Sequence, residues 1–88
     1  MKYRNDQVED IQVAYIGGGS RGWAWTFMTD LAMEPAICGT IRLYDIDRAA
    51  ARANETIGNS LYDREDVPGK WHYCVKDTLE EALAGADF

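Results

Sequence analysis

The sequence is poor in the residues that build disulfide frameworks and metal sites. It holds two cysteines, Cys38 and Cys74, without Cys-x-x-Cys spacing, and a single histidine, His72. Disulfide frameworks and zinc sites need such residues in greater number and at closer spacing. We therefore expect two reduced, mostly buried thiols, a structural or surface histidine, and no metal site in this chain.

Positive charge and long apolar runs are also scarce. The chain has 9 lysines and arginines against 15 aspartates and glutamates, a net charge of −6. Nucleic acid and anionic membranes would repel such a chain, so neither is an expected partner. Residues 5–10 are polar where an export signal would be apolar, and no apolar run has membrane-spanning length. The sequence predicts a cytoplasmic protein.

One glycine-rich segment carries the strongest functional signal. Gly17, Gly19 and Gly22 follow the apolar run at residues 11–16 and precede a helical pattern that begins at Trp23. This is the Gly-x-Gly-x-x-Gly turn of dinucleotide-binding proteins. The first glycine permits the tight turn, the second lets the backbone approach a pyrophosphate, and the third lets the helix lie close to the strand. Free N–H groups and the positive end of the helix dipole would face the anion.

An acidic residue stands where such proteins bind the ribose hydroxyls. Asp45 ends a second apolar run, residues 41–45, about twenty positions after the last glycine. Its carboxylate would repel a 2′-phosphate, which favours NAD over NADP. Arg42 and Arg48 are close enough in sequence to accommodate that phosphate, and they weaken the preference.

Three strand-like runs alternate with amphipathic stretches. Strands are expected at residues 11–16, 41–45 and 71–76, and helices at residues 22–33, 48–62 and from Thr78 onward. Asp47 should cap the second helix, and Thr78 with Glu81 forms a capping box. The second helix should bury Ala50, Ala53, Ile57 and Leu61. Such units require parallel strands with right-handed crossovers. The predicted fold class is α/β, a partial Rossmann (doubly wound) fold with three parallel strands in order 3-2-1.

The predicted domain organisation is a polar N-terminal tail at residues 1–10, followed by the N-terminal half of a dinucleotide-binding domain at residues 11–88. Residues 86–88 stand where a fourth strand would begin beside the first. We therefore expect a fragment truncated before that strand. The edge of the strand at residues 11–16 would then be unpaired, and we expect fragments to dimerise through it.

The same segments resemble a known family. Three segments of this chain match the beginning of that family's sequences. They are Val13-Ala14-Tyr15-Ile16-Gly17-Gly18-Gly19-Ser20, Trp23-Ala24-Trp25 with Asp30-Leu31-Ala32, and Leu43-Tyr44-Asp45-Ile46-Asp47. Together these segments look like the beginning of a family 4 glycoside hydrolase. That family includes α-glucosidases, α-galactosidases, α-galacturonidases and 6-phospho-glycosidases.

The resemblance implies a glycosidase that depends on NAD and on a divalent metal. In that family the sugar is oxidised at C3, a base removes the proton on C2, the aglycone leaves by elimination, and water addition and re-reduction complete the cycle. The metal, usually manganese, polarises the C3 oxygen and is bound by a cysteine and a histidine later in the chain. Neither Cys38 nor Cys74 matches that motif. The two-carboxylate mechanism of other glycosidases is therefore not expected.

The resemblance also completes the predicted site. In the family's pattern the hydroxyl and N–H of Ser20 lie near the phosphates, although Ser20 could merely cap the helix. Arg21 is either a solvated loop residue or a phosphate clamp, and Asp47 is first a helix cap with ribose or adenine contact as the alternative. The predicted cofactor-binding residues are Gly17, Gly19, Ser20, Arg21, Gly22, Asp45 and Asp47. No catalytic residue is predicted.

Three functions remain open from the sequence. The first is the NAD-binding segment of a family 4 glycosidase, with a small glycoside as substrate and a homo-oligomeric parent. The 88-residue chain alone should hydrolyse no glycoside and bind NAD weakly. The others are the nucleotide-binding half of a simple NAD-dependent dehydrogenase and a non-catalytic NAD-binding module.

Overall fold

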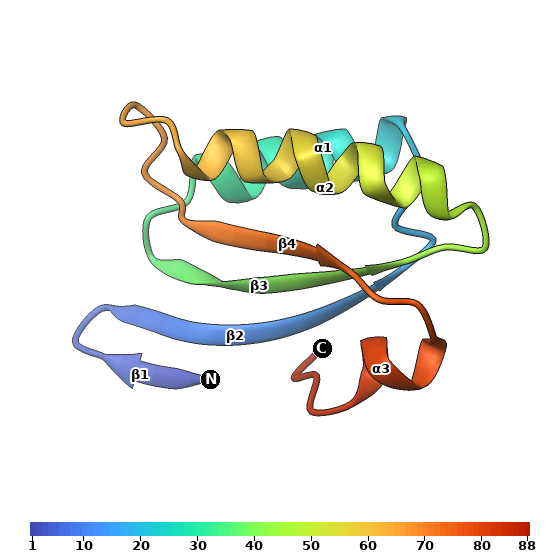
Figure 1. Cartoon of the computed structure of the whole chain (residues 1–88). Helices are drawn as coiled ribbons and strands as arrows, with labels where there is room; N and C mark the ends of the chain where they lie inside the picture. The colour runs from blue at the N-terminus through green and yellow to red at the C-terminus, as the bar shows by residue number, and fades with distance from the viewer.

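The computed structural model describes all residues 1–88 as one sheet with helices on both faces (Figure 1). Its elements are β1 (Lys2–Arg4), β2 (Gln7–Ile16), α1 (Gly22–Ala32), β3 (Ile37–Tyr44), α2 (Arg48–Tyr62), β4 (Trp71–Val75) and α3 (Leu79–Leu83). The predicted α/β class is confirmed. No helix is both long enough and apolar enough to cross a membrane.

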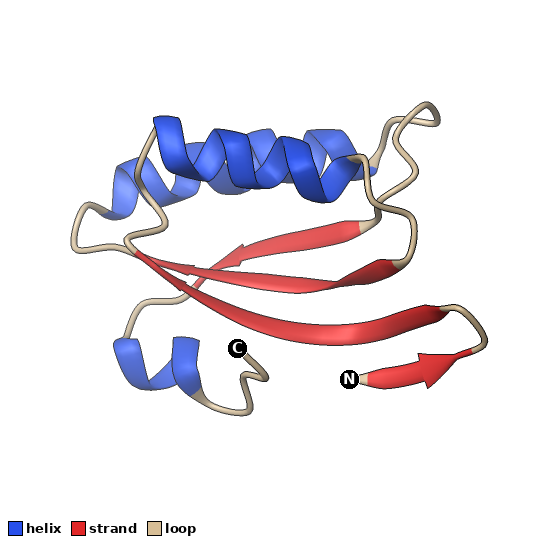
Figure 2. Ribbon diagram, turned by 180° about the vertical axis from the view of Figure 1, so that it is seen from behind, coloured by secondary structure: helices blue, strands red, loops and turns tan.

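The sheet has four strands in the order β1-β2-β3-β4. Strands β2, β3 and β4 are mutually parallel, and β1 is antiparallel to β2. Helices α1 and α2 lie side by side on one face, and the short α3 lies on the other (Figure 2). Because Ile16 pairs with Tyr44, β2 and β3 have their carboxyl ends at the same end of the sheet. The glycine-rich turn follows β2 and Asp45 follows β3 at that end.

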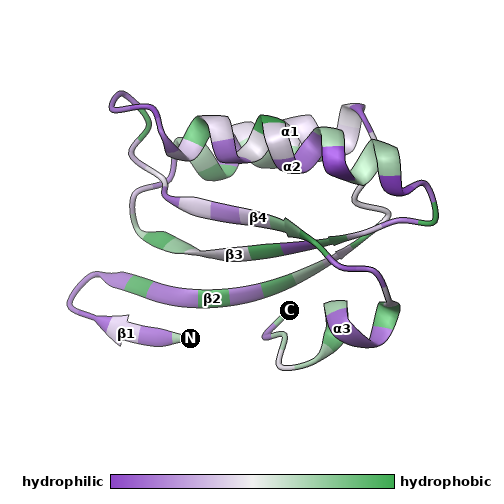
Figure 3. Cartoon of the chain, viewed as in Figure 1, coloured by the Kyte–Doolittle hydropathy of each residue, from purple (hydrophilic) through white to green (hydrophobic).

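The first ten residues are not a simple polar tail. Lys2 to Arg4 pair with Gln7 to Glu9, and β2 begins at Gln7 rather than at residue 11. Asn5 makes the turn with φ of +52°, a conformation that asparagine tolerates. The hairpin escaped prediction because its residues are largely exposed, and Figure 3 shows that most of them are hydrophilic. Backbone pairing of such residues leaves no apolar pattern in the sequence. The sheet therefore has four strands instead of three.

The outer edge of β2 is paired, contrary to the open edge predicted at residues 11–16. Ala14 N–H donates to the carbonyl of Phe88 at 3.0 Å, and Asp87 N–H donates to the carbonyl of Gln12 at 2.6 Å. The Asp87 carboxylate accepts from Gln12 N–H at 2.8 Å. Residues 86–88 thus lie beside β2 as expected, and their bonds to Gln12 and Ala14 occupy part of the edge that was to mediate dimerisation. Figure 1 shows both termini along this edge.

The core lies between the sheet and the two long helices, and comprises Ile11, Ala24, Met28, Ile41, Leu43, Ala51, Trp71 and Tyr73. Helix α2 has the predicted bounds, and Asp47 caps it by accepting from Ala50 N–H at 3.1 Å. Its buried face, however, is one position away from the predicted stripe and consists of Ala51, Asn54 and Gly58. The prediction followed the apolar residues, whereas close packing against Tyr73 requires glycine at position 58.

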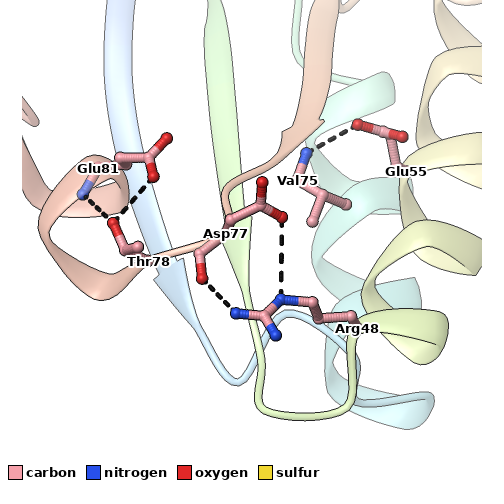
Figure 4. Close-up of polar contacts among 6 residues, drawn as sticks. All are labelled: Arg48, Glu55, Val75, Asp77, Thr78 and Glu81. Carbon is pink, nitrogen blue, oxygen red and sulfur yellow. Dashed lines mark hydrogen bonds and ion pairs between the residues drawn. The ribbon is translucent and has the colours of Figure 1, made fainter.

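Helix α3 begins with the predicted capping residues. Glu81 N–H donates to the hydroxyl of Thr78 at 3.1 Å, and that hydroxyl donates to the Glu81 carboxylate at 3.0 Å (Figure 4). After α3, Gly85 adopts φ of +72°. Glycine reaches this left-handed region without strain, so the chain can turn back toward β2.

Candidate functional site

The glycine-rich loop joins β2 to α1 and is tied to the end of β3. Gly17 has φ of +86°, so the tight turn expected of the first glycine is present. The N–H groups of Gly17 and Gly18 both donate to the Tyr44 carbonyl, at 2.8 and 2.9 Å. Ser20 N–H closes the turn by donating to the Gly17 carbonyl at 3.1 Å.

The glycines differ in how much room surrounds them. A Cβ at Gly18 would lie 2.8 Å from Leu43 Cβ, and one at Gly19 would lie 2.8 Å from Ala50 Cβ. A Cβ at Gly22 would meet nothing within 4 Å. The prediction that Gly22 allows close packing on the strand is therefore wrong. It occurs at Gly18, because the bond to the Tyr44 carbonyl draws that residue over β3.

The Asp45 carboxylate connects the loop to the start of α2. One oxygen accepts from Gly19 N–H at 3.0 Å, and the other accepts from Asp47 N–H at 2.9 Å. A carboxylate can accept about four hydrogen bonds. Asp45 therefore retains acceptor capacity for hydroxyl groups of a ligand while it holds the loop.

The first turn of α1 has free hydrogen-bond donors. The N–H groups of Arg21, Gly22 and Trp23 donate to no acceptor in the chain, and no side chain caps this helix. Ser20 does not cap it either, and its buried hydroxyl oxygen has no partner. The other helices are capped by Asp47 and Thr78. Unpaired donors at a helix N-terminus form a ready site for an anion.

Sequence reasoning missed Asn54, the residue that holds this loop from α2. Its side-chain amide nitrogen donates to the carbonyls of Gly18 and Ser20, and its oxygen accepts from the Trp25 indole. The signal that could have found it is a polar residue between small residues on the buried face of a helix. Beside it lies a cavity of about 350 Å³, lined by Gly19, Arg21, Trp25, Ala50, Ala53, Asn54 and Ile57.

The two arginines weighed as 2′-phosphate ligands are engaged elsewhere. Arg48 forms an ion pair with Asp77 and donates to its backbone carbonyl (Figure 4). Arg42 donates to the carbonyls of Ala82 and Ala84, on the α3 side of the sheet. Arg21, in contrast, is exposed beside the loop and pairs with no acidic side chain.

Residues with metal-ligating side chains are dispersed. No three histidine, cysteine, aspartate or glutamate side chains lie close enough to hold an ion. Cys38 and Cys74 are free thiols of intermediate exposure, so they are less buried than expected. His72 is exposed and stacks on the Tyr62 ring with 4.1 Å between centroids. We assign no metal site to these residues.

Known proteins match this chain along nearly all of its length. Residues 12–88 match the model of a family described as family 4 glycosyl hydrolase. The α-galacturonidases of Lachnoclostridium phytofermentans and Thermoanaerobacterium saccharolyticum are 64% and 62% identical to it over 88 residues. Each match covers 100% of this chain and 19% of the relative. A solved structure titled as a putative glucosidase, lplD from Bacillus subtilis, has a TM-score of 0.80 and 45% identity, covering 91% of this chain and 17% of that one.

Proposed function

The chain belongs to the family 4 glycosyl hydrolases, and on that premise we propose that it supplies the NAD-binding part of an α-galacturonidase. Two relatives more than 60% identical to the whole chain are named α-galacturonidases. That similarity supports an α-galacturonide as the substrate. It also favours a glycosidase over the dehydrogenase and the non-catalytic module that the sequence left open.

The donors at the start of α1 are the groups that would bind the pyrophosphate of NAD. The amides of Arg21, Gly22 and Trp23 have no acceptor within the chain, and the Ser20 hydroxyl is buried without a partner. The residues that carry these three amides are exposed, so a phosphate can reach the donors, and a helix N-terminus favours an anion. This set of unpartnered donors is the observation that carries the proposal.

Asp45 would bind the adenosine ribose and select NAD. It lies beside the loop, and its oxygens can accept from the ribose hydroxyls in addition to their present bonds. A 2′-phosphate would instead meet this carboxylate, while Arg42 and Arg48 are already engaged with backbone carbonyls. The Asp45 carboxylate would repel the 2′-phosphate, and neither arginine is free to neutralise that phosphate. This arrangement favours NAD over NADP.

NAD, when bound, would supply the hydride acceptor with which family members oxidise the sugar at C3. In this proposal residues 1–88 bind and orient the cofactor, and the catalytic base and manganese ligands belong to other parts of the enzyme. We propose, accordingly, that residues 1–88 alone hydrolyse no galacturonide. The proposed parent is a homo-oligomer of the cytoplasm.

The test uses the protein at its full natural length. We expect release of galacturonic acid from an α-galacturonide that requires both manganese and NAD, and tighter binding of NAD than of NADP by calorimetry. Dialysis against a chelator, followed by addition of manganese alone, NAD alone or both together, separates the two requirements. Hydrolysis that persists without NAD, or equal affinity for NAD and NADP, would contradict the proposal.

A further inference from the structure

Asn54 is an almost fully buried polar residue, 2% exposed, on the face of α2 that meets the glycine-rich loop. Its amide nitrogen donates to the Gly18 carbonyl at 2.8 Å and to the Ser20 carbonyl at 2.7 Å. Its oxygen accepts from the Trp25 indole N–H at 2.9 Å. A single side chain therefore contacts the loop on both sides of Gly19 and the helix that follows.

The direction of these bonds determines where the loop amides point. In a trans peptide unit the C=O and the N–H point in opposite directions. Because the Gly18 carbonyl points toward Asn54, the N–H of Gly19 points away from it, and that N–H meets the Asp45 carboxylate at 3.0 Å. Because the Ser20 carbonyl also points toward Asn54, the N–H of Arg21 points away, and it has no partner.

We propose that Asn54 is a positioning residue that holds the Gly18–Gly19 and Ser20–Arg21 peptide units, so that the first directs its N–H to Asp45 and the second leaves its N–H free for the pyrophosphate of NAD. This inference rests on the proposed function. Asn54 would not touch the cofactor. Trp25 keeps the Asn54 amide oriented, since its indole N–H occupies the side-chain oxygen and leaves the nitrogen for the two carbonyls.

The same helix offers a matched control. Asn59 also bonds the backbone of a neighbouring element, donating to and accepting from Tyr73 on β4, both at 2.8 Å. None of the side-chain hydrogen bonds of Asn59 reaches the glycine-rich loop. Loss of either asparagine should lower stability, but only loss of Asn54 should alter the loop.

The experiment compares Asn54→Asp with Asn59→Asp in the full-length protein. Aspartate at position 54 can still accept from Trp25 but cannot donate to the two carbonyls. ADP-ribose, which carries the pyrophosphate, is titrated by calorimetry, and adenosine, which lacks it, by NMR. We expect Asn54→Asp to weaken ADP-ribose binding by about tenfold or more, with adenosine affinity little changed. Asn59→Asp should leave both affinities unchanged.

A second variant covers the case in which Asn54→Asp does not fold. Trp25→Phe removes the donor that orients Asn54 and should weaken ADP-ribose binding in the same direction by a smaller factor. Unchanged ADP-ribose affinity in the folded variants, parallel losses for adenosine, or an equal loss in Asn59→Asp would overturn the inference. Failure of the unaltered protein to bind NAD at all would instead contradict the proposed function.

Discussion

The carboxylate of Asp45 accepts a hydrogen bond from the backbone N–H of Gly19 at 3.0 Å. This bond joins the residue expected to bind ribose to the loop expected to bind phosphate. The two parts of the proposed nucleotide site therefore form one hydrogen-bonded unit before any ligand arrives. A change at either residue should affect both parts.

The first prediction concerns the charge of that unit. Asp45→Ala should cost about 1.5–3 kcal/mol of NAD binding free energy, because charged hydrogen bonds to ribose and the support of Gly19 are both lost. Calorimetry on the full-length protein measures it. Asp66→Ala, which removes an exposed aspartate that pairs with Arg64, is the control and should leave the affinity unchanged. An equal effect of both substitutions would contradict the assigned role.

Two glycines of the loop should respond differently to an added methyl group. Gly18→Ala should lower the free energy of unfolding by about 1–3 kcal/mol, because its Cβ would press on Leu43. Gly22→Ala should change stability by no more than about 1 kcal/mol, since its Cβ would meet open space at the start of a helix. It should nevertheless weaken NAD binding about tenfold by occupying the anion's position. Denaturant unfolding and calorimetry separate the two effects, and unaltered NAD binding by Gly22→Ala would count against the proposed site.

Asp47 should act mainly on the helix that it caps. Asp47→Ala removes the acceptor for Ala50 N–H and should lower the free energy of unfolding by about 1 kcal/mol. NAD affinity should change far less than in Asp45→Ala. A loss of affinity as large as that of Asp45→Ala would favour the alternative in which Asp47 binds ribose or adenine directly.

Stability should fall at high pH because of Tyr73. This side chain is 4% exposed, and burial raises the pKa of its phenol above the ordinary value of 10.0. The folded state thus holds the proton more tightly than the unfolded state, so the free energy of unfolding decreases as pH rises above about 10. In Tyr73→Phe the free energy of unfolding should no longer show this decrease at high pH. Tyr3→Phe, which changes an exposed tyrosine, should still show it. Equal slopes in the two variants would refute the assignment.

The paired edge of β2 should be visible by hydrogen exchange. Gln12 N–H donates to the Asp87 carboxylate, so Asp87→Ala should accelerate exchange of that amide. The amide of Val13, a residue that pairs with Ile41 on β3, is the internal control and should keep its rate. Rapid exchange at Gln12 already in the unaltered protein would restore the open edge that the sequence predicted.

Several elements could be predicted because their signals are local. The tight turn at Gly17, the caps at Asp47 and Thr78 and the bounds of α2 each depend on residues within a few positions. The hairpin of β1 could not, because backbone pairing of exposed residues leaves no periodic apolar pattern. The buried face of α2 was predicted one position away from its true place for a related reason. The elements packed against α2 require small or hydrogen-bonding residues on that face, and a search for hydrophobic residues does not find them.

By itself the sequence determined the α/β class, the order of helices and strands along the parallel part of the chain, and the position of the glycine-rich turn. Hydrophobic periodicity, capping and turn chemistry act over short distances, so a linear pattern carries them. Only the tertiary structure decided that Asp45 bonds Gly19, 26 positions away, and that Asn54 bonds Gly18, 36 positions away. It also decided that Arg42 and Arg48 are engaged outside the loop. Such contacts depend on how the strands and helices pack, and no local pattern encodes that arrangement.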